Sequence, residues 1–204
     1  MTSGGYDDGY AACECFWGKD PGSLVRLLTS YILNFEGLSV LDAGCGEGKN
    51  AAFLAQLGAT VSAIDVSERA IANALKSWSQ ISRIQFEIGN VESMALSANA
   101  WDVVVMYGLL HCISSLHAIE NTVRRLQSST KPKGFNVLCA FNDRHQDLSA
   151  HPGFSPTLAP HDFYVGLYED WNIIHVSDSD LFEVHPHNHI PHSHSLTRLI
   201  AVKA

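Results

Sequence analysis

Short apolar runs alternate along this chain with segments whose apolar residues recur every three or four positions. A continuous apolar run is typical of a buried parallel strand, and a stripe at helical spacing is typical of an amphipathic helix. We predict strands at seven places: 38–41, 60–65, 84–88, 101–106, 135–141, 171–182 and 195–203. Because helical patterns separate the early strands, the chain is predicted to form a mainly parallel sheet with helices on both faces.

Polar residues and prolines mark the expected starts of the helices. Pro21 begins a predicted helix that runs to Asn34, Ser67 is a predicted N-cap, and Ser114 or Ser115 caps a later helix. The other expected segments are helices over 49–57 and 161–168, a turn over 131–134 and an irregular loop over 142–160. Residues 1–12 are rich in glycine and tyrosine and are predicted to be loose or draped over the surface.

The stretch from Leu38 to Gly48, LSVLDAGCGEG, organises the rest of the chain. An apolar run ends in Asp42, and glycines follow at every second position, at Gly44, Gly46 and Gly48. Glycine has no Cβ, so its backbone can turn sharply and approach a ligand closely. A strand, a glycine loop and a helix in this order predict the first unit of a Rossmann-like nucleotide-binding fold.

Composition narrows the classes of function. With 204 residues, 46% hydrophobic and 17% charged, the chain is expected to form one globular domain over 1–204, in which 1–20 is a flexible or cleft-covering segment. A net charge of −8 without any basic run argues against a nucleic-acid partner. No apolar run reaches the ~20 residues of a membrane helix, and the polar start predicts no secretory signal, so we expect a cytoplasmic protein without a membrane partner.

The positions of the cysteines also favour the cytoplasm. Three of the five cysteines lie in apolar or glycine-loop segments, which favours reduced thiols over a disulfide framework. The single pair Cys13 and Cys15 is read as two ordinary thiols rather than a metal site. Phe16 and Trp17 follow and need cover, so they either pack on the core or cap the ligand cleft.

From roughly residue 20 onward the chain resembles the class I S-adenosylmethionine-dependent methyltransferases. Four segments carry the resemblance, in the order of the family: VLDAGCGEG (40–48), Asp65, GNVE (89–92) and WDVVVMYGLLH (101–111). Asn90 departs from the pattern, since many members have Asp there, but an amide can still hydrogen-bond adenine. Within the family the chain looks most similar to the small tellurite-resistance-type and thiopurine-type enzymes. The resemblance implies an α/β fold: a three-layer Rossmann-like sandwich around a mostly parallel seven-stranded sheet with an antiparallel last strand.

The resemblance also implies S-adenosylmethionine as cofactor and S-adenosylhomocysteine as product. Asp42 would face the ammonium and sulfonium groups, Asp65 would accept hydrogen bonds from both ribose hydroxyls, and Asn90 and Val91 would contact adenine. The remaining implied cofactor-binding residues are Gly44, Cys45, Gly46, Gly48, Val66, Glu92 and Tyr107. Structural alternatives stay open for both acids: Asp42 as a cap of the next helix, and Asp65 as a surface acid at the end of a strand.

Methyl transfer is an in-line displacement, for which the protein mainly supplies orientation and desolvation. A base is needed only when the nucleophile arrives protonated. His111, four residues after Tyr107, is the candidate catalytic residue, although a lone histidine after a buried strand is more commonly structural.

A second unusual stretch, 183–194, reads EVHPHNHIPHSH and holds five of the eleven histidines. If the last strand is antiparallel, as the resemblance implies, this loop borders the substrate opening, and the rim is predicted to include Trp17, His187, His189 and His192. Histidines two apart share a face in extended chain and can bind a metal. A catalytic or oxyanion-binding histidine and a solvated polar loop are the competing interpretations. Pro186 and Pro191 interrupt strand geometry, so the solvated loop is favoured and no metal ligand is predicted.

Together these observations predict a methyltransferase that transfers a methyl group to sulfur, nitrogen, oxygen or a metalloid of a small-molecule acceptor, as a monomer or homodimer. An NAD-dependent oxidoreductase is one alternative, but G-x-G-x-x-G requires glycine where Lys49 stands. A non-catalytic metal- or ligand-binding protein that uses the histidine stretch is the other.

Overall fold

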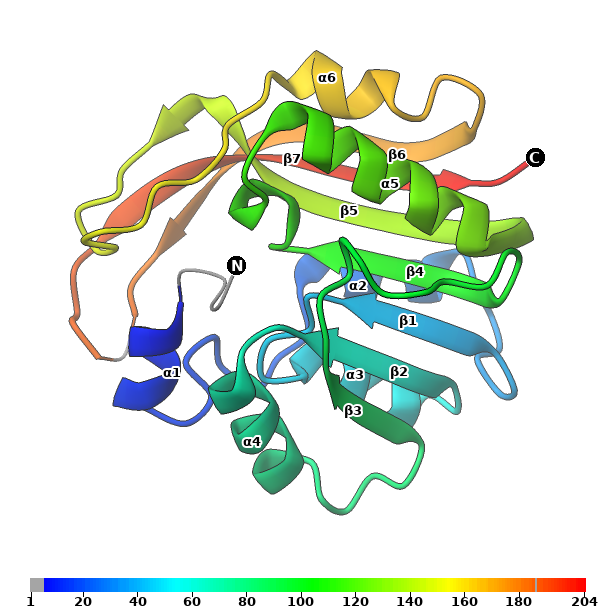
Figure 1. Ribbon diagram of the computed structural model, residues 1–204, viewed down its shortest axis with the longest axis horizontal. Helices are drawn as coiled ribbons and strands as arrows, with labels where there is room; N and C mark the ends of the chain where they lie inside the picture. Colours follow the sequence, from blue (N-terminus) through cyan, green and yellow to red (C-terminus); the bar gives the residue numbers. More distant parts are fainter. Residues whose placement is uncertain (1–5, 186) are drawn as a thin grey trace.

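The computed structural model describes residues 6–185 and 187–204, and Figure 1 shows how their helices and strands are arranged. One seven-stranded sheet crosses the molecule in the order β3-β2-β1-β4-β5-β7-β6. Its strands are β1 (Ser39–Ala43), β2 (Thr60–Asp65), β3 (Ile84–Ile88), β4 (Trp101–Tyr107), β5 (Thr130–Gln146), β6 (Asn172–Glu183) and β7 (His192–Val202). The first five strands pair in parallel, and β7 runs antiparallel to both of its neighbours, β5 and β6.

Helices cover both faces of this sheet, which confirms the predicted three-layer fold (Figure 1). They are α1 (Asp7–Ala12), α2 (Ser23–Leu27), η1 (Leu28–Ser30), α3 (Lys49–Gln56), α4 (Glu68–Ser77), η2 (Leu110–Cys112), α5 (Leu116–Ser129) and α6 (His161–Gly166). None of the described helices is long and apolar enough to cross a membrane.

Alternation along the central strands divides the core between the two faces. Val103 and Val105 of β4 pack in the cluster that contains residues of α2, α3 and α4, whereas Val104 and Met106 pack with residues of α5 and α6. All four side chains are fully buried. A parallel strand covered on both faces needs apolar residues at every position, which is why β4 reads as an unbroken β-branched run.

The helix starts agree with the capping signals in the sequence. Ser67 caps α4 by accepting a hydrogen bond from the Ala70 backbone N–H at 3.1 Å. Of the two predicted caps for α5, Ser115 has this role, since its hydroxyl accepts from the Ala118 N–H at 3.2 Å. A side-chain oxygen at this position satisfies one of the unpaired N–H groups of the first turn.

The predicted helix from Pro21 to Asn34 is too long. The α-helix ends at Leu27 and continues only as the short 3-10 helix η1 to Ser30. Leu33 is 96% exposed, so a longer helix would present an apolar residue that nothing covers.

β5 extends beyond both of its predicted ends, to Thr130 and Gln146, but its pairing is irregular outside 135–141. In place of the predicted turn over 131–134 there is a bulge: pairing with β4 passes from Thr130 to Phe135, and Lys133 has a φ of 64°. Pairing with β7 shifts after Phe141, and β7 begins at His192, inside the stretch that we expected to be a solvated loop. The two strands support each other through antiparallel pairing that extends to Gln146 and His194. Local sequence patterns do not contain this pairing, because its partners lie about 50 residues apart.

The N-terminal segment is helical over Asp7–Ala12, so of the two predictions for 1–20, a flexible or a cleft-covering segment, the structure agrees with the second; residues 1–5 lie outside the described part of the chain. Asp7–Ala12 form helix α1, and Tyr6 and Tyr10 are 9% and 8% exposed. Phe16 is also buried, which agrees with core packing. Trp17 lines a pocket at the carboxyl ends of the strands, which agrees with cleft capping.

Candidate active site

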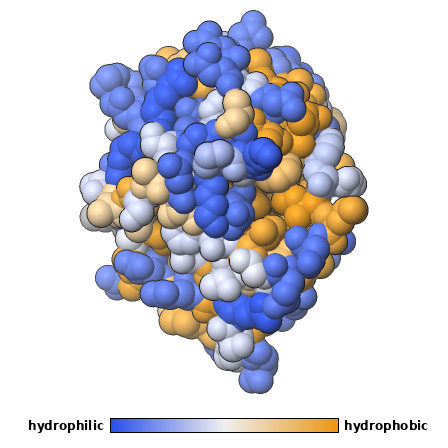
Figure 2. All heavy atoms as spheres, turned by 90° about the vertical axis from the view of Figure 1, so that its right-hand side faces the viewer, coloured by the Kyte–Doolittle hydropathy of each residue, from blue (hydrophilic) through white to orange (hydrophobic). Residues whose placement is uncertain are grey.

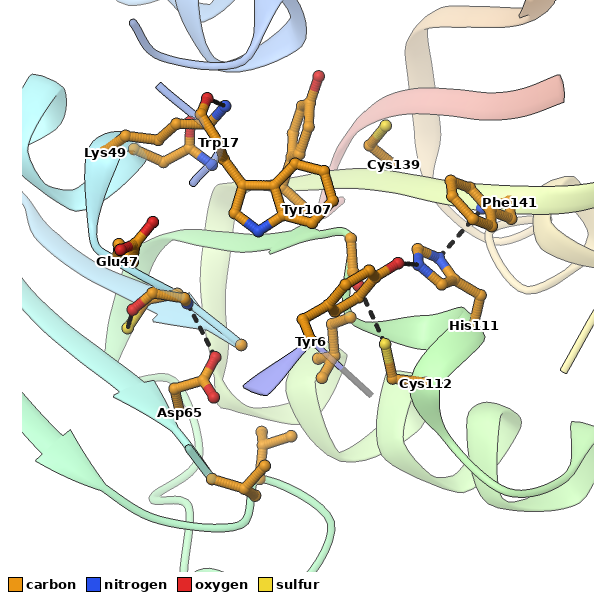
Figure 3. Close-up of a pocket in the computed structure, with 18 of the residues that line it drawn as sticks. Tyr6, Trp17, Glu47, Lys49, Asp65, Tyr107, His111, Cys112, Cys139 and Phe141 are labelled. Carbon is orange, nitrogen blue, oxygen red and sulfur yellow. Dashed lines mark hydrogen bonds between the residues drawn. The ribbon is translucent and has the colours of Figure 1, made fainter. Parts of the chain in front are cut away.

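A pocket of about 400 Å³ opens at the carboxyl ends of the parallel strands (Figure 3). It lies where the strand order reverses between β1 and β4, which is where doubly wound sheets bind ligands. The topology therefore places the glycine loop and the ends of β2 and β4 around one cavity. Figure 2 shows the side of the molecule at the other end of these strands, which carries mostly hydrophilic side chains with apolar ones gathered along one side.

The glycine loop after β1 requires glycines for two physical reasons. Gly44, Gly46 and Gly48 have φ angles of 70°, 53° and 79°, a region that other L-residues rarely adopt. A Cβ at Gly44 would also lie 2.9 Å from the side chain of Leu109. Gly44 and Gly46 line the pocket, whereas Gly48 packs against the ring of Phe86 and does not belong to the pocket lining.

Asp65 stands at the end of β2 and faces the pocket across the glycine loop (Figure 3). Its two carboxylate oxygens accept hydrogen bonds from the backbone N–H groups of Gly46, at 2.8 Å, and Ser67, at 2.9 Å. These bonds hold the loop to β2 and fix the carboxylate, and each oxygen keeps a second lone pair for a ligand. Burial raises the pKa of Asp65, and the two N–H donors offset part of that rise.

Asp42 lies beneath the loop rather than on the pocket surface. It is 1% exposed, is not among the pocket-lining residues, and within the described residues neither of its oxygens makes a hydrogen bond of ordinary geometry. Burial raises the pKa of Asp42 to about 7. The nearby backbone N–H of Ala51, in the first turn of α3, favours the charged form and offsets part of this rise. A carboxyl in this state is sensitive to any positive charge that enters the pocket.

The segment after β3 forms another wall. Gly89, Asn90, Val91 and Glu92 all line the pocket, as does Val66 after β2. The Asn90 side-chain oxygen accepts a hydrogen bond from the Glu92 N–H at 2.9 Å, so the side chain shapes its own turn. Its amide nitrogen is the group with donors to offer a ligand.

His111, in η2, is fully enclosed and lies at the far end of the pocket from Asp65 (Figure 3). Its Nδ1 accepts a hydrogen bond from the Phe141 N–H at 3.2 Å, so the proton of the neutral ring is on Nε2, which lies 3.1 Å from the Tyr6 hydroxyl. Burial lowers the pKa of His111 to about 3. The imidazole is therefore neutral at physiological pH and donates toward Tyr6.

The N-terminal segment supplies pocket residues that sequence analysis did not identify. Tyr6 and Tyr10 line the pocket together with the predicted Trp17, whose indole N–H donates to the Tyr10 hydroxyl at 3.3 Å. Two contacts anchor this segment: the Lys49 ammonium donates to the Trp17 carbonyl at 2.8 Å, and the Cys15 N–H donates to the Glu47 carboxylate at 2.9 Å. Only the crowding of aromatic residues near the N-terminus pointed to this role.

The predicted substrate rim is only partly formed by the predicted residues. Of the four predicted rim residues, Trp17 lines the pocket, His187 and His189 are exposed, and His192 lines a second cavity beside Glu183. Tyr107, predicted to bind the cofactor, also lines the pocket. The lining residues on that side are Leu181, Glu183, Leu196 and Arg198. The interpretation of 183–194 as a solvated loop is wrong for His185, His192 and His194, which are 3%, 5% and 0% exposed.

Sequence comparison finds a family match in the middle of the chain. Residues 40–134 match the family described as a methyltransferase domain. An uncharacterized methyltransferase of Schizosaccharomyces pombe is 40% identical over 76 residues, which are 37% of this chain and 52% of that protein. A ubiquinone biosynthesis O-methyltransferase of Rhizobium leguminosarum is 29% identical and covers 64% of this chain and 48% of its own length. The chain thus spans about half the length of the sequence relatives it matches.

Structural comparison extends the likeness over the whole sheet. TehB from Haemophilus influenzae has a TM-score of 0.73 at 20% identity, covering 88% of this chain and 61% of its own. A Methanosarcina mazei S-adenosylmethionine-dependent methyltransferase scores 0.71 at 18% identity and covers 90% and 98%. A Burkholderia thailandensis 1,6-didemethyltoxoflavin-N1-methyltransferase, solved with S-adenosylhomocysteine, scores 0.68 at 18% identity and covers 98% and 85%.

At these identities the solved structures show the fold alone, and residues 40–134, slightly less than half of the chain, match a methyltransferase domain. The predicted resemblance to the S-adenosylmethionine-dependent methyltransferases is thereby confirmed for this segment and for the fold.

Proposed function

We propose that this protein is an S-adenosylmethionine-dependent methyltransferase that acts on a small-molecule acceptor. The observation that carries the proposal is the convergence of the glycine loop, the fixed Asp65 carboxylate and the Asn90 turn on one pocket at the switch point of the sheet. The proposal treats the chain as a single catalytic domain that works in the cytoplasm as a monomer or homodimer.

The residues present suit the cofactor. Asp65 would accept hydrogen bonds from the ribose hydroxyls, Asn90 and Val91 would contact adenine, and the backbone of Gly44 and Gly46 would lie against the methionyl part. Asp42, buried and without a hydrogen-bond partner among the described residues, would gain the positive charge that stabilises its ionised form. Three related structures, all methyltransferases, contain S-adenosylmethionine or S-adenosylhomocysteine, which supports this cofactor here.

When bound, S-adenosylmethionine supplies a methyl group already activated on a sulfonium, which a nucleophile displaces in line. The work left to the protein is orientation and exclusion of water. Tyr6, Tyr10 and Trp17 cover the pocket from the N-terminal side, and Tyr107 and Phe141 add aromatic surface beyond the cofactor end (Figure 3). An enclosed aromatic wall of this kind suits a small, partly apolar acceptor better than a polymer.

We propose for His111 a positioning contribution at the acceptor end. Its Nε2–H donates to the Tyr6 hydroxyl, and the lone pair on Nδ1 is occupied by the Phe141 N–H. In this tautomer the ring offers a hydrogen bond rather than a base. A catalytic role for His111 stays a prediction that turnover measurements on variants decide.

Calorimetric titration of the purified, metal-stripped protein with S-adenosylmethionine, S-adenosylhomocysteine and NAD tests the proposal. We expect the two adenosyl ligands to bind with micromolar affinity and NAD to give no heat of binding. Release of S-adenosylhomocysteine in a screen of thiol, amine, phenol and metalloid oxyanion acceptors then identifies the substrate class. Binding of NAD with silence toward both adenosyl ligands would overturn the proposal.

A further inference from the structure

Three histidines and one glutamate converge beside the pocket, at the end of the β6–β7 hairpin. Glu183 is the last residue of β6, and His192 and His194 lie at the start of β7, two positions apart and so on one face of the strand. His151 comes from the segment that follows β5. The three histidines are buried and Glu183 is half-buried, so these polar groups meet in a largely water-free place.

The ligand atoms of these four residues all lie within 4.8 Å of one another. His151 Nε2 is 3.1 Å from His192 Nε2, and the Glu183 Oε1 is 3.5 Å from His192 Nε2 and 3.6 Å from His194 Nε2. A tetrahedral zinc ion with bonds of about 2.0–2.1 Å has donor atoms about 3.3 Å apart. Three of the donor pairs are therefore near the spacing of a four-coordinate metal site, and all four donors lie within 4.8 Å of one another.

Hydrogen bonds on the far side of two rings fix which nitrogen carries the proton. The Gln146 amide nitrogen donates to the backbone carbonyls of Asn142, at 2.7 Å, and Ser195, at 2.9 Å. The other end of that amide, Oε1, therefore accepts from the His194 Nδ1–H at 2.8 Å. His192 Nδ1–H likewise donates to the Ile190 carbonyl at 2.8 Å. In both rings Nε2 is left with a lone pair that faces the cluster, the arrangement of metal-binding histidines.

Hydrogen bonding alone does not satisfy this cluster. Within the described chain, His194 Nε2 has no hydrogen-bond partner although it is buried. His151 Nε2 lies between two other ring nitrogens, His192 Nε2 at 3.1 Å and His185 Nε2 at 3.2 Å, and it carries at most one proton. Lone pairs and a carboxylate facing one another in a buried site are costly unless a cation lies among them.

We propose that His151, Glu183, His192 and His194 bind a zinc-type divalent transition-metal ion. Three imidazole nitrogens and one carboxylate oxygen form a donor set that suits zinc and other first-row ions of similar softness, and it is a poor set for magnesium or calcium. This assignment replaces the expectation that the chain has no metal ligands. It does not depend on the proposed methyl transfer.

The location of the site connects it to the pocket of the candidate active site. Glu183 lines that pocket as well as the second cavity beside His192. The ring of Phe141 stacks on His194 on one side and on His111 on the other, with centroid distances of 4.2 and 3.9 Å. The metal ion would thus stabilise the wall at the acceptor end of the pocket.

Metal binding is best measured on the untagged, full-length protein, stripped with a chelator and then titrated with Co²⁺. We expect about one equivalent to bind, with the intense visible bands of a four-coordinate ion, and Zn²⁺ to displace it. X-ray absorption on the zinc-loaded protein should show a nitrogen and oxygen shell near 2.0 Å with imidazole scattering. Absence of binding at micromolar Co²⁺ and Zn²⁺, or a six-coordinate spectrum, would overturn the site.

Two ligand variants and one matched control locate the ion. His192→Ala and Glu183→Gln are each expected to weaken metal affinity by at least about tenfold. Loss of a group that only hydrogen-bonds a metal ligand already costs about 10- to 100-fold, and these two residues would bind the ion directly. His187→Ala is the control, because His187 lies in the same hairpin connection and is exposed. Far-ultraviolet circular dichroism of each variant without metal checks that the protein is folded. Equal metal affinity in all three variants and the parent would mean that the ion binds elsewhere, which contradicts the proposal.

Discussion

Asp65 shows how a single acid combines structure and recognition. Both of its oxygens already hold backbone N–H groups, and one of these belongs to the glycine loop, so the carboxylate is oriented before any ligand arrives. Preorganisation of this kind lowers the entropy that a ligand must lose on binding. The sequence alone identified Asp65 from its place at the end of the second strand.

Asp65→Asn is expected to weaken S-adenosylmethionine binding by about 1.5–3 kcal/mol, the usual contribution of a hydrogen bond to a charged group. Calorimetric titration measures the dissociation constant. Glu68→Gln is the matched control, because Glu68 is an exposed acid three residues further along the chain. An affinity that stays within about twofold of the parent protein would remove Asp65 from the cofactor site.

Asp42 makes stability depend on pH. Its pKa in the folded protein is raised to about 7 from 3.8, so the folded state holds a proton that the unfolded state has already lost over that range. The contribution of Asp42 to the free energy of unfolding is fully present below about pH 4. It falls by up to about 4 kcal/mol as the pH rises to about 7. Asp42→Asn removes this dependence.

Thermal melts between pH 4 and 9 measure the effect. The difference in Tm between Asp42→Asn and the parent should shift in favour of the variant from pH 4 to about 7.5 and stay constant above it. Asp170→Asn, at an exposed position, should follow the parent at every pH. A constant difference for Asp42→Asn across the range would mean that Asp42 is ionised in the folded protein throughout.

His111 is tested together with its partner. His111→Asn should lower methyl turnover by at least about tenfold while the S-adenosylmethionine affinity stays within about twofold, if the ring acts at the acceptor end. Tyr6→Phe removes only the hydroxyl that His111 contacts. If Tyr6→Phe lowers turnover as much as His111→Asn, the histidine acts by positioning Tyr6; if both variants lose cofactor affinity, neither role is correct.

At the scale of elements, the segment over residues 6–17 was predicted to be either flexible or a cover for the cleft, and its contacts agree with the second prediction. Tyr6 and Trp17 of this segment line the pocket (Figure 3), and a small hydrogen-bond network around Glu47 and Asn73 holds the segment in place. The Asn73 amide donates to the Tyr10 carbonyl at 3.0 Å and to the Glu47 carboxylate at 2.9 Å. These contacts join residues more than 25 positions apart, so no local pattern announces them.

Asn73→Ala removes both hydrogen bonds and is expected to release this segment, with a local cost of about 1–3 kcal/mol. Hydrogen exchange should become faster in residues 6–17 while β1 and β4 keep their protection. Asn121→Ala, at an exposed position on α5, serves as the control. Unchanged exchange over 6–17 would show that aromatic packing alone holds the segment.

The predicted elements agree with the structure where an apolar run or a helix cap within the element itself specifies them. The strands β1 to β4 and the Ser67 cap follow from apolar runs and turn chemistry within a few residues. The length of β5 and the start of β7 did not follow, because their antiparallel pairing is a contact between distant segments. The turn signal of Lys131–Gly134 is realised as a bulge in β5, where Lys133 has a φ of 64° and pairing with β4 passes from Thr130 to Phe135.

At the scale of the whole molecule, ligand binding and folding are linked. A ligand that binds only the folded state at about 100 times its dissociation constant adds about 2.7 kcal/mol of stability. For a chain of this size that corresponds to a rise in Tm of about 5–10 °C. S-adenosylmethionine and S-adenosylhomocysteine are expected to produce such a rise and NAD to produce none. Scanning calorimetry at matched ligand concentrations measures it, and equal shifts with all three would indicate nonspecific binding.

The sequence by itself determined the order of strands and helices, the glycine loop and the acids at the strand ends. These features depend on residues that are neighbours in the chain, and the physics of strands, caps and turns acts at that range. Only the tertiary structure decided that Asp42 is buried beneath the loop, that Tyr6 and Tyr10 cover the pocket, and that His151 meets Glu183, His192 and His194. Their partners are brought together by sheet pairing across tens of residues, and burial, which sets their chemistry, exists only once the sheet has formed.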